Sequence, residues 1–347
     1  MPMLWFGLAA VLLAIYVVMD GFDFGAGTLH LFVARTDAER RQVLGAIGPF
    51  WDGNEVWLLT AGGTLMLAFP RVLGAGLSGF YLAIMMVLWV LIIRGIAIEF
   101  RSHLEDKLWR QFWDGAFALA SMLAPVLLGV ALGNLVRGVP LQADGWFSLP
   151  LFASLSPTGV LGMLDWFTTL AGVLALVALA HHGALFLAWR TGGPVRDRSV
   201  AAARVLFVVT CALWLLATAA TLHLAPDMRA ALTVRPLAWV ATAVMVAGLL
   251  GSGLLRGRGR DLAAFIASGA FLFGLLAATA ACLYPTLIRS AVDPRHSLTV
   301  LNASSSEHAL RTGLWWWPLG FVLAVGYVWM LFRLHRGRTS GGDGAGY

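Results

Sequence analysis

The chain has 347 residues, of which 59% are hydrophobic and only 12% are charged, and its mean hydropathy is +0.81. Soluble globular domains carry about 25% charged residues, so this composition excludes a soluble enzyme and predicts an integral membrane protein. The formal net charge of +6 does not indicate nucleic-acid binding, because no soluble basic domain or RNA-binding motif accompanies it.

Apolar runs between charge clusters predict the membrane-spanning helices. Each run is close to the ~20 residues that cross about 30 Å of hydrocarbon, and each is apolar on all sides, which argues against the alternating pattern of a β-barrel. The predicted spans are residues 3–24, 55–70, 76–98, 115–136, 159–189, 203–222, 236–255, 262–283 and 314–333. The predicted fold class is an all-α integral membrane protein with about nine transmembrane helices, as two four-helix bundles plus one additional helix.

The positive charge predicts how this membrane domain is oriented. When every Lys and Arg is assigned to the nearer end of its span, 17 of the 24 fall on the side that holds the C-terminus. The positive-inside rule therefore predicts an outside N-terminus and a cytoplasmic C-terminus. No basic stretch precedes the first apolar run, so we expect that run to remain as a span. Residues 1–338 are predicted to form one polytopic membrane domain and residues 339–347 a disordered tail.

Ionisable groups near the ends of the first three spans are the main functional candidates, because charge within a span is costly. Pairs of acids spaced i,i+3 share a helical face. The third predicted span ends on two arginines and a further acid. We expect these groups to meet at the cytoplasmic edge, with the composition that a proton path requires. They are Asp20, Asp23, Asp52, Glu55, Arg94, Glu99 and Arg101.

The alternative is a purely structural network, in which Arg94 neutralises an acid and Asp52 caps the second span. Ion pairs at helix ends are ordinary, so this alternative is favoured for Asp20, Glu99 and Arg101. A functional role is favoured for Asp23 and Asp52, because their Gly and aromatic neighbours offer little other solvation.

Two adjacent histidines, His181 and His182, lie near the inner end of the fifth predicted span. They point about 100° apart on a helix, which argues against one shared metal. The favoured interpretation is one interfacial and one hydrogen-bonded histidine, with haem ligation or proton relay as the alternative. Cys211 and Cys282 lack metal-ligand spacing and are interpreted as small apolar packers, so no metal site is predicted.

Two further patterns concern helix packing and the membrane interface. Gly21 with Gly25, and Gly129 with Gly133, fit the GxxxG pattern of close helix approach. The run Trp315-Trp316-Trp317-Pro318 predicts an aromatic belt at the outer start of the last span, with a quinone ring site as the alternative.

Two motifs, Asp20-Gly21-Phe22-Asp23 and the segment Trp51–Leu58 (WDGNEVWL), together resemble subunit II of the cytochrome bd-type quinol oxidases. The Trp-Asp-Gly-Asn motif is specific, and the resemblance covers most of the chain, except residues 142–157 and 222–236. The amino-acid sequence of Arg94–Arg101 resembles that of the cyanide-insensitive branch of this family, which leaves the haem composition open. The other matching segments, in the same order, are Phe69-Pro70, Ser78–Tyr81, Gly129–Asn134, Gly138–Pro140, Gly183-Ala184, Tyr284-Pro285, Leu298-Thr299 and Asn302–Ser305.

The resemblance implies a role in a respiratory complex of the bacterial inner membrane. In such oxidases the partner, subunit I, carries two b-type haems and haem d, oxidises quinol and reduces dioxygen to water. Subunit II is its nine-helix partner without haem ligands, holds a structural quinone in some members, and is joined by a small accessory subunit in others.

The resemblance also implies residue roles, with no catalytic residue in this subunit. The position of Asp52 is expected to lie on a proton route from the cytoplasm, with Asp23 close by. Asp20 and Glu55 are expected to belong to the same route. The residues expected to support it are Trp51, Asn54, Arg94, Glu99 and Arg101. A secondary transporter and a purely structural membrane subunit are the alternatives. The expected position of the acids at span ends argues against a transporter, whose site lies at the midplane.

Overall fold

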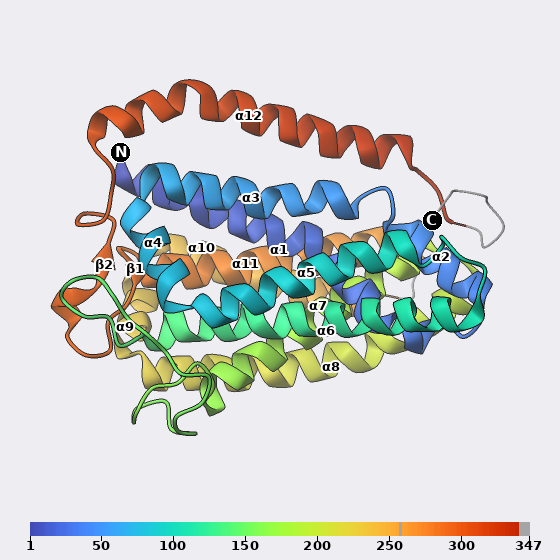
Figure 1. Ribbon diagram of the computed structural model, residues 1–347, viewed down its shortest axis with the longest axis horizontal. Helices are drawn as coiled ribbons and strands as arrows, with labels where there is room; N and C mark the ends of the chain where they lie inside the picture. The colour runs from blue at the N-terminus through green and yellow to red at the C-terminus, as the bar shows by residue number, and fades with distance from the viewer. Residues whose placement is uncertain (257–258, 340–347) are drawn as a thin grey trace.

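The computed structural model describes residues 1–256 and 259–339, and nearly all of the long segments in it are helices. Long helices run side by side along the molecule, and short helices and loops gather at its two ends (Figure 1). Among the described residues, eight helices are long and apolar enough to cross a membrane, or nine if one bent pair counts as a span. This confirms the predicted all-α membrane class.

The helices follow one another in the order in which Figure 1 labels them. They are α1 (Pro2–Val33), α2 (Asp37–Ile47), α3 (Trp51–Ala68), α4 (Pro70–Gly79), α5 (Tyr81–Phe100), α6 (Lys107–Arg137), α7 (Trp166–Arg190), α8 (Gly193–Leu224), α9 (Pro226–Val234), α10 (Pro236–Leu255), α11 (Asp261–Leu283) and α12 (Glu307–Leu334). Between α11 and α12 lie two short antiparallel strands, β1 (Thr286–Ile288) and β2 (Leu298–Thr299), and a 3₁₀ turn at Pro294–His296.

The first helix is longer than predicted. The span expected at residues 3–24 continues as α1 to Val33, about two and a half further turns. Gly25 and Gly27 do not end it, because both are buried where α1 meets its neighbours. Asp20 and Asp23 therefore lie inside a continuous helix, and the prediction that they mark its inner end is wrong.

Two other predicted boundaries are also wrong. The helix α3 ends at Ala68, and the chain turns by 120° into α4, because Pro70 has a fixed φ and disfavours helix in the residue before it. Residues 76–79 therefore belong to α4, and the third span is α5. Residues 159–165 precede the fifth span, since the Asp165 carboxylate caps α7 by accepting the backbone N–H groups of Phe167 and Thr168.

Glycines set the closest helix crossings. A Cβ built on Gly25 of α1 would lie 2.7 Å from the Cα of Gly183 on α7. On α7, a Cβ at Gly172 would lie 2.9 Å from the carbonyl oxygen of Val126 on α6, and Gly274 brings α11 equally close to α10. The predicted GxxxG glycines Gly25 and Gly129 therefore do lie at helix crossings. Each packs against the backbone of α7, where its partner is a glycine outside any GxxxG pattern.

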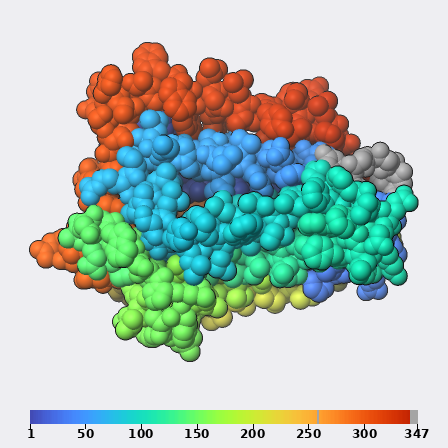
Figure 2. Space-filling view, viewed as in Figure 1, coloured from blue at the N-terminus to red at the C-terminus, as the bar shows by residue number. Residues whose placement is uncertain are grey.

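The helices divide into two groups that meet where α7 packs on α1 and α6. The helices α1, α3, α5 and α6 form one group, and α7, α8, α10 and α11 form the other. The additional helix α12 lies along α3 at the edge of the molecule, as the red band of Figure 2 shows. Trp315 on α12 is 87% exposed, whereas the Trp317 indole N–H turns inward and donates to Thr64 Oγ1 at 3.1 Å.

The connections alternate between the two ends of the molecule (Figure 1). The N-terminus, α4, α9, β1 and β2 lie at one end, and α2 lies at the other beside the last described residues. This is the alternation that nine spans require. Of the predicted disordered tail, Thr339 is described and donates its backbone N–H to the Arg190 carbonyl oxygen at 2.8 Å. Residues 340–347 lie outside the described residues.

Candidate functional site

A buried arginine holds two of the predicted acids. Arg94 on α5 donates from Nη1 to Asp20 Oδ1 on α1 at 2.6 Å, and from Nη2 to Glu55 Oε1 on α3 at 2.6 Å. The side chains of Asp20 and Arg94 are 0% exposed, and that of Glu55 is 30% exposed. The guanidinium also lies over the Phe24 ring, 4.3 Å from its centroid. A single cation therefore compensates one fully buried carboxylate and one that reaches the surface.

Asp23 lies one turn from Asp20 and has a different kind of partner. The Asn54 side-chain amide on α3 donates to Asp23 Oδ2 at 2.8 Å and to the Met19 carbonyl oxygen at 3.1 Å. Asp23 is fully buried, and among the described residues no Lys, Arg or His forms a salt bridge with it. An amide is a weaker partner for a carboxylate than a cation. Asp23 is thus the buried acid with the least charge compensation.

Asp52 and Glu99 do not join this group. Both residues are exposed, and α3 begins at Trp51 with Phe50 at its N-cap and no side-chain cap, so the structural alternative in which Asp52 caps the helix is wrong. Trp51 is half-buried and lies beside Gly95, whose added Cβ would be 3.2 Å from the indole ring. The expected convergence of five acids is therefore limited to Asp20, Asp23 and Glu55.

Arg101 belongs to a second cluster. Its Nε donates to Asp114 Oδ1 at 2.6 Å, and its Nη2 donates to Asp37 Oδ1 at 2.7 Å. Asp114 also accepts Arg40 Nη1 at 2.9 Å and lies 2.7 Å from His30 Nε2. Burial by itself would raise the pKa of Asp37, but the neighbouring Arg101 holds it below its ordinary value. The structural interpretation of Arg101 thus has support, with partners that the sequence did not suggest.

His30 and Asp114 are the site residues that sequence reasoning missed. His30 is 0% exposed, and it was overlooked because it lay beyond the predicted end of the first span. One signal could have found it: His30 follows Asp23 by seven residues, which places both on one face of a longer helix. Asp114 offered no such signal, since its partners come from three other helices.

His181 and His182 are both buried and both hydrogen-bonded, so the interpretation of one as interfacial is wrong. His181 Nε2 lies 3.1 Å from Ser252 Oγ on α10. His182 Nδ1 lies 2.6 Å from Ser268 Oγ on α11, and its Nε2 lies 3.0 Å from the Val18 carbonyl oxygen. The two rings therefore face different helices. Within residues 1–256 and 259–339, no group of three His, Cys, Asp or Glu side chains could hold a metal ion.

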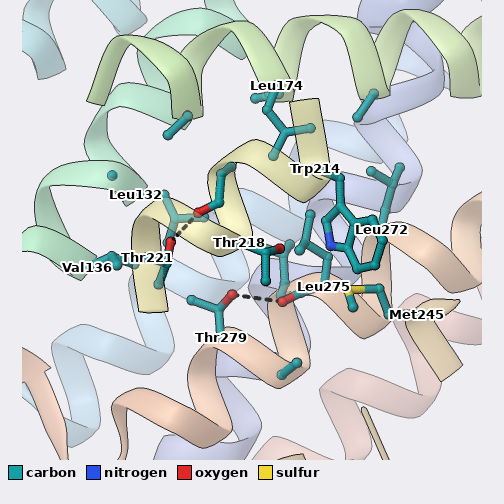
Figure 3. Close-up of a pocket in the computed structure, with 18 of the residues that line it drawn as sticks. Leu132, Val136, Leu174, Trp214, Thr218, Thr221, Met245, Leu272, Leu275 and Thr279 are labelled. Atoms are coloured by element: carbon teal, nitrogen blue, oxygen red, sulfur yellow. Dashed lines mark hydrogen bonds between the residues drawn. The ribbon is translucent and has the colours of Figure 1, made fainter. Parts of the chain in front are cut away.

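A separate apolar cavity of about 280 Å³ lies between α6, α7, α8, α10 and α11. Figure 3 shows Leu174, Leu272 and Leu275 along its walls. Two of its threonine hydroxyls are bound within their own helices, since Thr221 Oγ1 donates to the Ala217 carbonyl oxygen and Thr279 Oγ1 donates to the Leu275 carbonyl oxygen, each at 2.8 Å. Trp214 also lines the cavity, and its buried indole N–H has no hydrogen-bond partner. The cavity is therefore largely apolar, and the Trp214 N–H is a polar donor available to a molecule bound in it.

The family model described as cytochrome bd terminal oxidase subunit II matches residues 1–335. The chain belongs to that family.

Similar members come from several bacteria. The cytochrome bd-I ubiquinol oxidase subunit 2 of Escherichia coli K12 is 40% identical over 218 residues, which are 62% of this chain and 55% of that protein. The match thus spans about half the length of the E. coli relative. The cytochrome bd ubiquinol oxidase subunit 2 of Bacillus subtilis is 34% identical over 89% of this chain and 88% of its own. The probable cytochrome oxidase subunit 2 of Haemophilus influenzae is 31% identical, with 95% and 93% covered.

A solved structure shares the fold of this subunit II family member. The structure of bd oxidase from Geobacillus thermodenitrificans contains a chain that superposes with a TM-score of 0.73 over 96% of this chain and 98% of that chain, at 20% identity. This likeness concerns the fold alone. The family match favours a terminal oxidase subunit over the transporter alternative.

Proposed function

We propose that this chain is the second subunit of a quinol-oxidising, dioxygen-reducing complex in the bacterial cytoplasmic membrane. In this proposal it pairs with a haem-bearing subunit I and delivers cytoplasmic protons for the reduction of dioxygen to water. The observation that carries the proposal is the group of buried Asp20, Asp23, Asn54 and Arg94 with the partly exposed Glu55, because ionisable groups inside a membrane subunit are costly and therefore mark functional sites.

The geometry supports a division of roles within this group. Arg94 compensates Asp20 and Glu55 and fixes their positions. Asp23 has only the Asn54 amide, so we assign Asp23 as the carboxyl group that holds the transferred proton. Asp52, exposed on the first turn of α3, receives protons at the surface of the subunit. Trp51 and the exposed Glu99 shape the surroundings.

The haems are assigned to the partner, because the two histidines considered as haem ligands, His181 and His182, already bind other groups. A haem needs an axial ligand such as His. Both ring nitrogens of His182 already have partners, and His181 has one nitrogen bound to Ser252. No histidine lines the apolar cavity in the described part of the chain. We therefore propose that two b-type haems and haem d belong to subunit I. The cavity, with its unpartnered Trp214 N–H, suits the carbonyl oxygen of a structural quinone instead.

Replacing one carboxyl group tests the proton role. We expect Asp23→Asn to slow oxygen consumption by the purified complex about a hundredfold, the lower end of the range for loss of a positioned proton-transfer group. The reduced-minus-oxidised haem spectrum should stay unchanged. Glu105→Gln, which removes an exposed carboxylate from the same end of the molecule, is the matched control and should be neutral. Normal turnover and normal charge separation in Asp23→Asn would leave only the scaffold role.

A further inference from the structure

A buried polar stripe follows one face of α1 well beyond the acid pair. Tyr16, Asp20, Asp23, Gly27 and His30 recur at steps of four, three, four and three residues, the spacing of a single helical face. All five are buried. The stripe is about 21 Å long at 1.5 Å per residue. Along one helix it joins the group around Arg94, which includes Asp20 and Glu55, to the cluster around Asp114, which includes His30.

Each of the polar side chains on the stripe has a buried polar atom without a partner. These atoms are Tyr16 OH, Asp20 Oδ2, Asp23 Oδ1 and His30 Nδ1. Buried polar groups are nearly always hydrogen-bonded to protein or to ordered water. Four such atoms on one face are therefore best explained by internal water molecules that connect them.

Ser121 on α6 fills the one non-polar position of the stripe. A Cβ at Gly27 would collide with Ser121 Oγ, so this hydroxyl lies directly against the helix backbone between Asp23 and His30. Ser121 Oγ is also buried and without a partner. The Ser121 carbonyl oxygen accepts the Thr28 hydroxyl at 3.0 Å, which fixes the two helices in register. Glycine at position 27 is thus what allows a hydroxyl group to enter the stripe.

The cytoplasmic end of the stripe connects to the surface. His30 Nε2 lies 2.7 Å from Asp114 Oδ1, and Asp114 Oδ2 accepts Arg40, whose side chain is 24% exposed. Asp114 and Ser121 are seven residues apart on α6, hence on the same face of that helix. Two antiparallel helices therefore line the same polar path.

We propose that Asp114, His30, Ser121, Asp23, Asp20 and Tyr16 form a hydrated line that carries protons from the cytoplasmic end of α1 to the buried carboxyl pair. Asp114 passes a proton to His30 Nε2 and regains one from water at the cytoplasmic end, while His30 releases the proton on Nδ1. The ring keeps one proton, now on Nε2, and returns it to Nδ1 before the next transfer. The released proton passes through water and the Ser121 hydroxyl, which accepts one proton and donates another, to Asp23 Oδ1. The line rests on the proposed function, and adds to it an internal inlet that is separate from the exposed Asp52.

Proton uptake by the purified complex tests the line. Reduced complex is mixed with oxygen in a stopped-flow instrument, and a pH-indicator dye records uptake. His30→Gln keeps a donor for Asp114 but cannot carry a proton, and Ser121→Ala removes the hydroxyl group. Each should slow uptake about a hundredfold. The matched controls are His181→Gln and Ser199→Ala, a buried histidine and a buried serine off the stripe, and both should retain the wild-type rate.

The outcomes separate this line from the proposed function. If Asp23→Asn slows uptake while His30→Gln and Ser121→Ala do not, the line is wrong and the proton role of Asp23 stands. If Asp23→Asn also takes up protons normally, both fail.

A second measurement does not depend on the variants folding. Radiolytic hydroxyl labelling of the wild-type complex should modify buried Tyr16 as readily as the half-buried Tyr284, because internal water lies next to Tyr16. Protection of Tyr16 at doses that modify Tyr284 would show a dry stripe and overturn the proposal.

Discussion

At the scale of single residues, the stability of the fold depends on the two ion pairs that Arg94 forms. Its guanidinium is completely buried and pairs with Asp20 and Glu55. Breaking a buried pair by removing one partner costs about 3–5 kcal/mol, because the other charge is left uncompensated. We therefore expect Arg94→Gln to lower the thermal unfolding midpoint of the purified complex. The double variant Arg94→Gln/Asp20→Asn should recover part of that loss. Equal destabilisation by the single and double variants would show that the Asp20 charge is not what Arg94 compensates.

The sequence predicted part of this chemistry and missed the rest for identifiable reasons. The i,i+3 spacing correctly drew attention to Asp20 and Asp23, and Arg94 was correctly expected to neutralise an acid. Asp52 was grouped with them by its motif, yet a residue in the first turn of a helix can face outward. Asp114 and Ser121 became visible only through tertiary contacts. Their seven-residue spacing places them on one face of α6, but that spacing does not show which helix the face meets.

At the scale of helices, glycine contacts decide how closely α1 and α7 approach. A Cβ on Gly25 would lie within 2.7 Å of Gly183 and would collide with the Leu179 carbonyl oxygen, both of which are backbone and cannot move aside. We expect Gly25→Ala to prevent this crossing and to reduce the yield of folded complex in size-exclusion chromatography. Gly7→Ala, on the same helix but with nothing within 4 Å, is the control. A normal yield from Gly25→Ala would mean that the crossing can widen without loss.

The helical class followed from composition, and the nine predicted spans agree with the eight or nine candidate spans of the described residues, but the helix ends did not follow from it. Apolar length alone predicted the spans, since hydrocarbon thickness fixes that length. The helix α1 exceeded its predicted span because its buried glycines act as contact points rather than stops. The opposite error occurred at Pro70, where an apolar stretch was divided by a bend that backbone sterics impose. Both errors concern residues whose effect depends on a neighbouring helix or on a backbone angle, neither of which hydropathy measures.

At the scale of the whole molecule, the two ends differ in charge, and the proton route requires one orientation. The end that holds α2 carries the Asp37, Arg40, Arg101 and Asp114 cluster, together with the inlet at His30. It is also the end on which most of the Lys and Arg residues lie, which the positive-inside rule assigns to the cytoplasm. The opposite end holds the segment 138–165 and the strands (Figure 1). If the orientation were reversed, the buried acids would draw protons from the outer side.

Cysteine labelling of whole cells decides the orientation. In a background where Cys211 and Cys282 are replaced by Ala, a single cysteine is placed at an exposed position of either end, as Ser156→Cys or Glu105→Cys. A membrane-impermeant maleimide should label Ser156→Cys in intact cells, because the predicted orientation places segment 138–165 on the outer side. It should label Glu105→Cys only after the cells are permeabilised, because residue 105 lies at the end that holds the His30 inlet. The reverse pattern would place Asp114 and His30 in the outer solution, and no cytoplasmic proton could then reach Asp23 along α1.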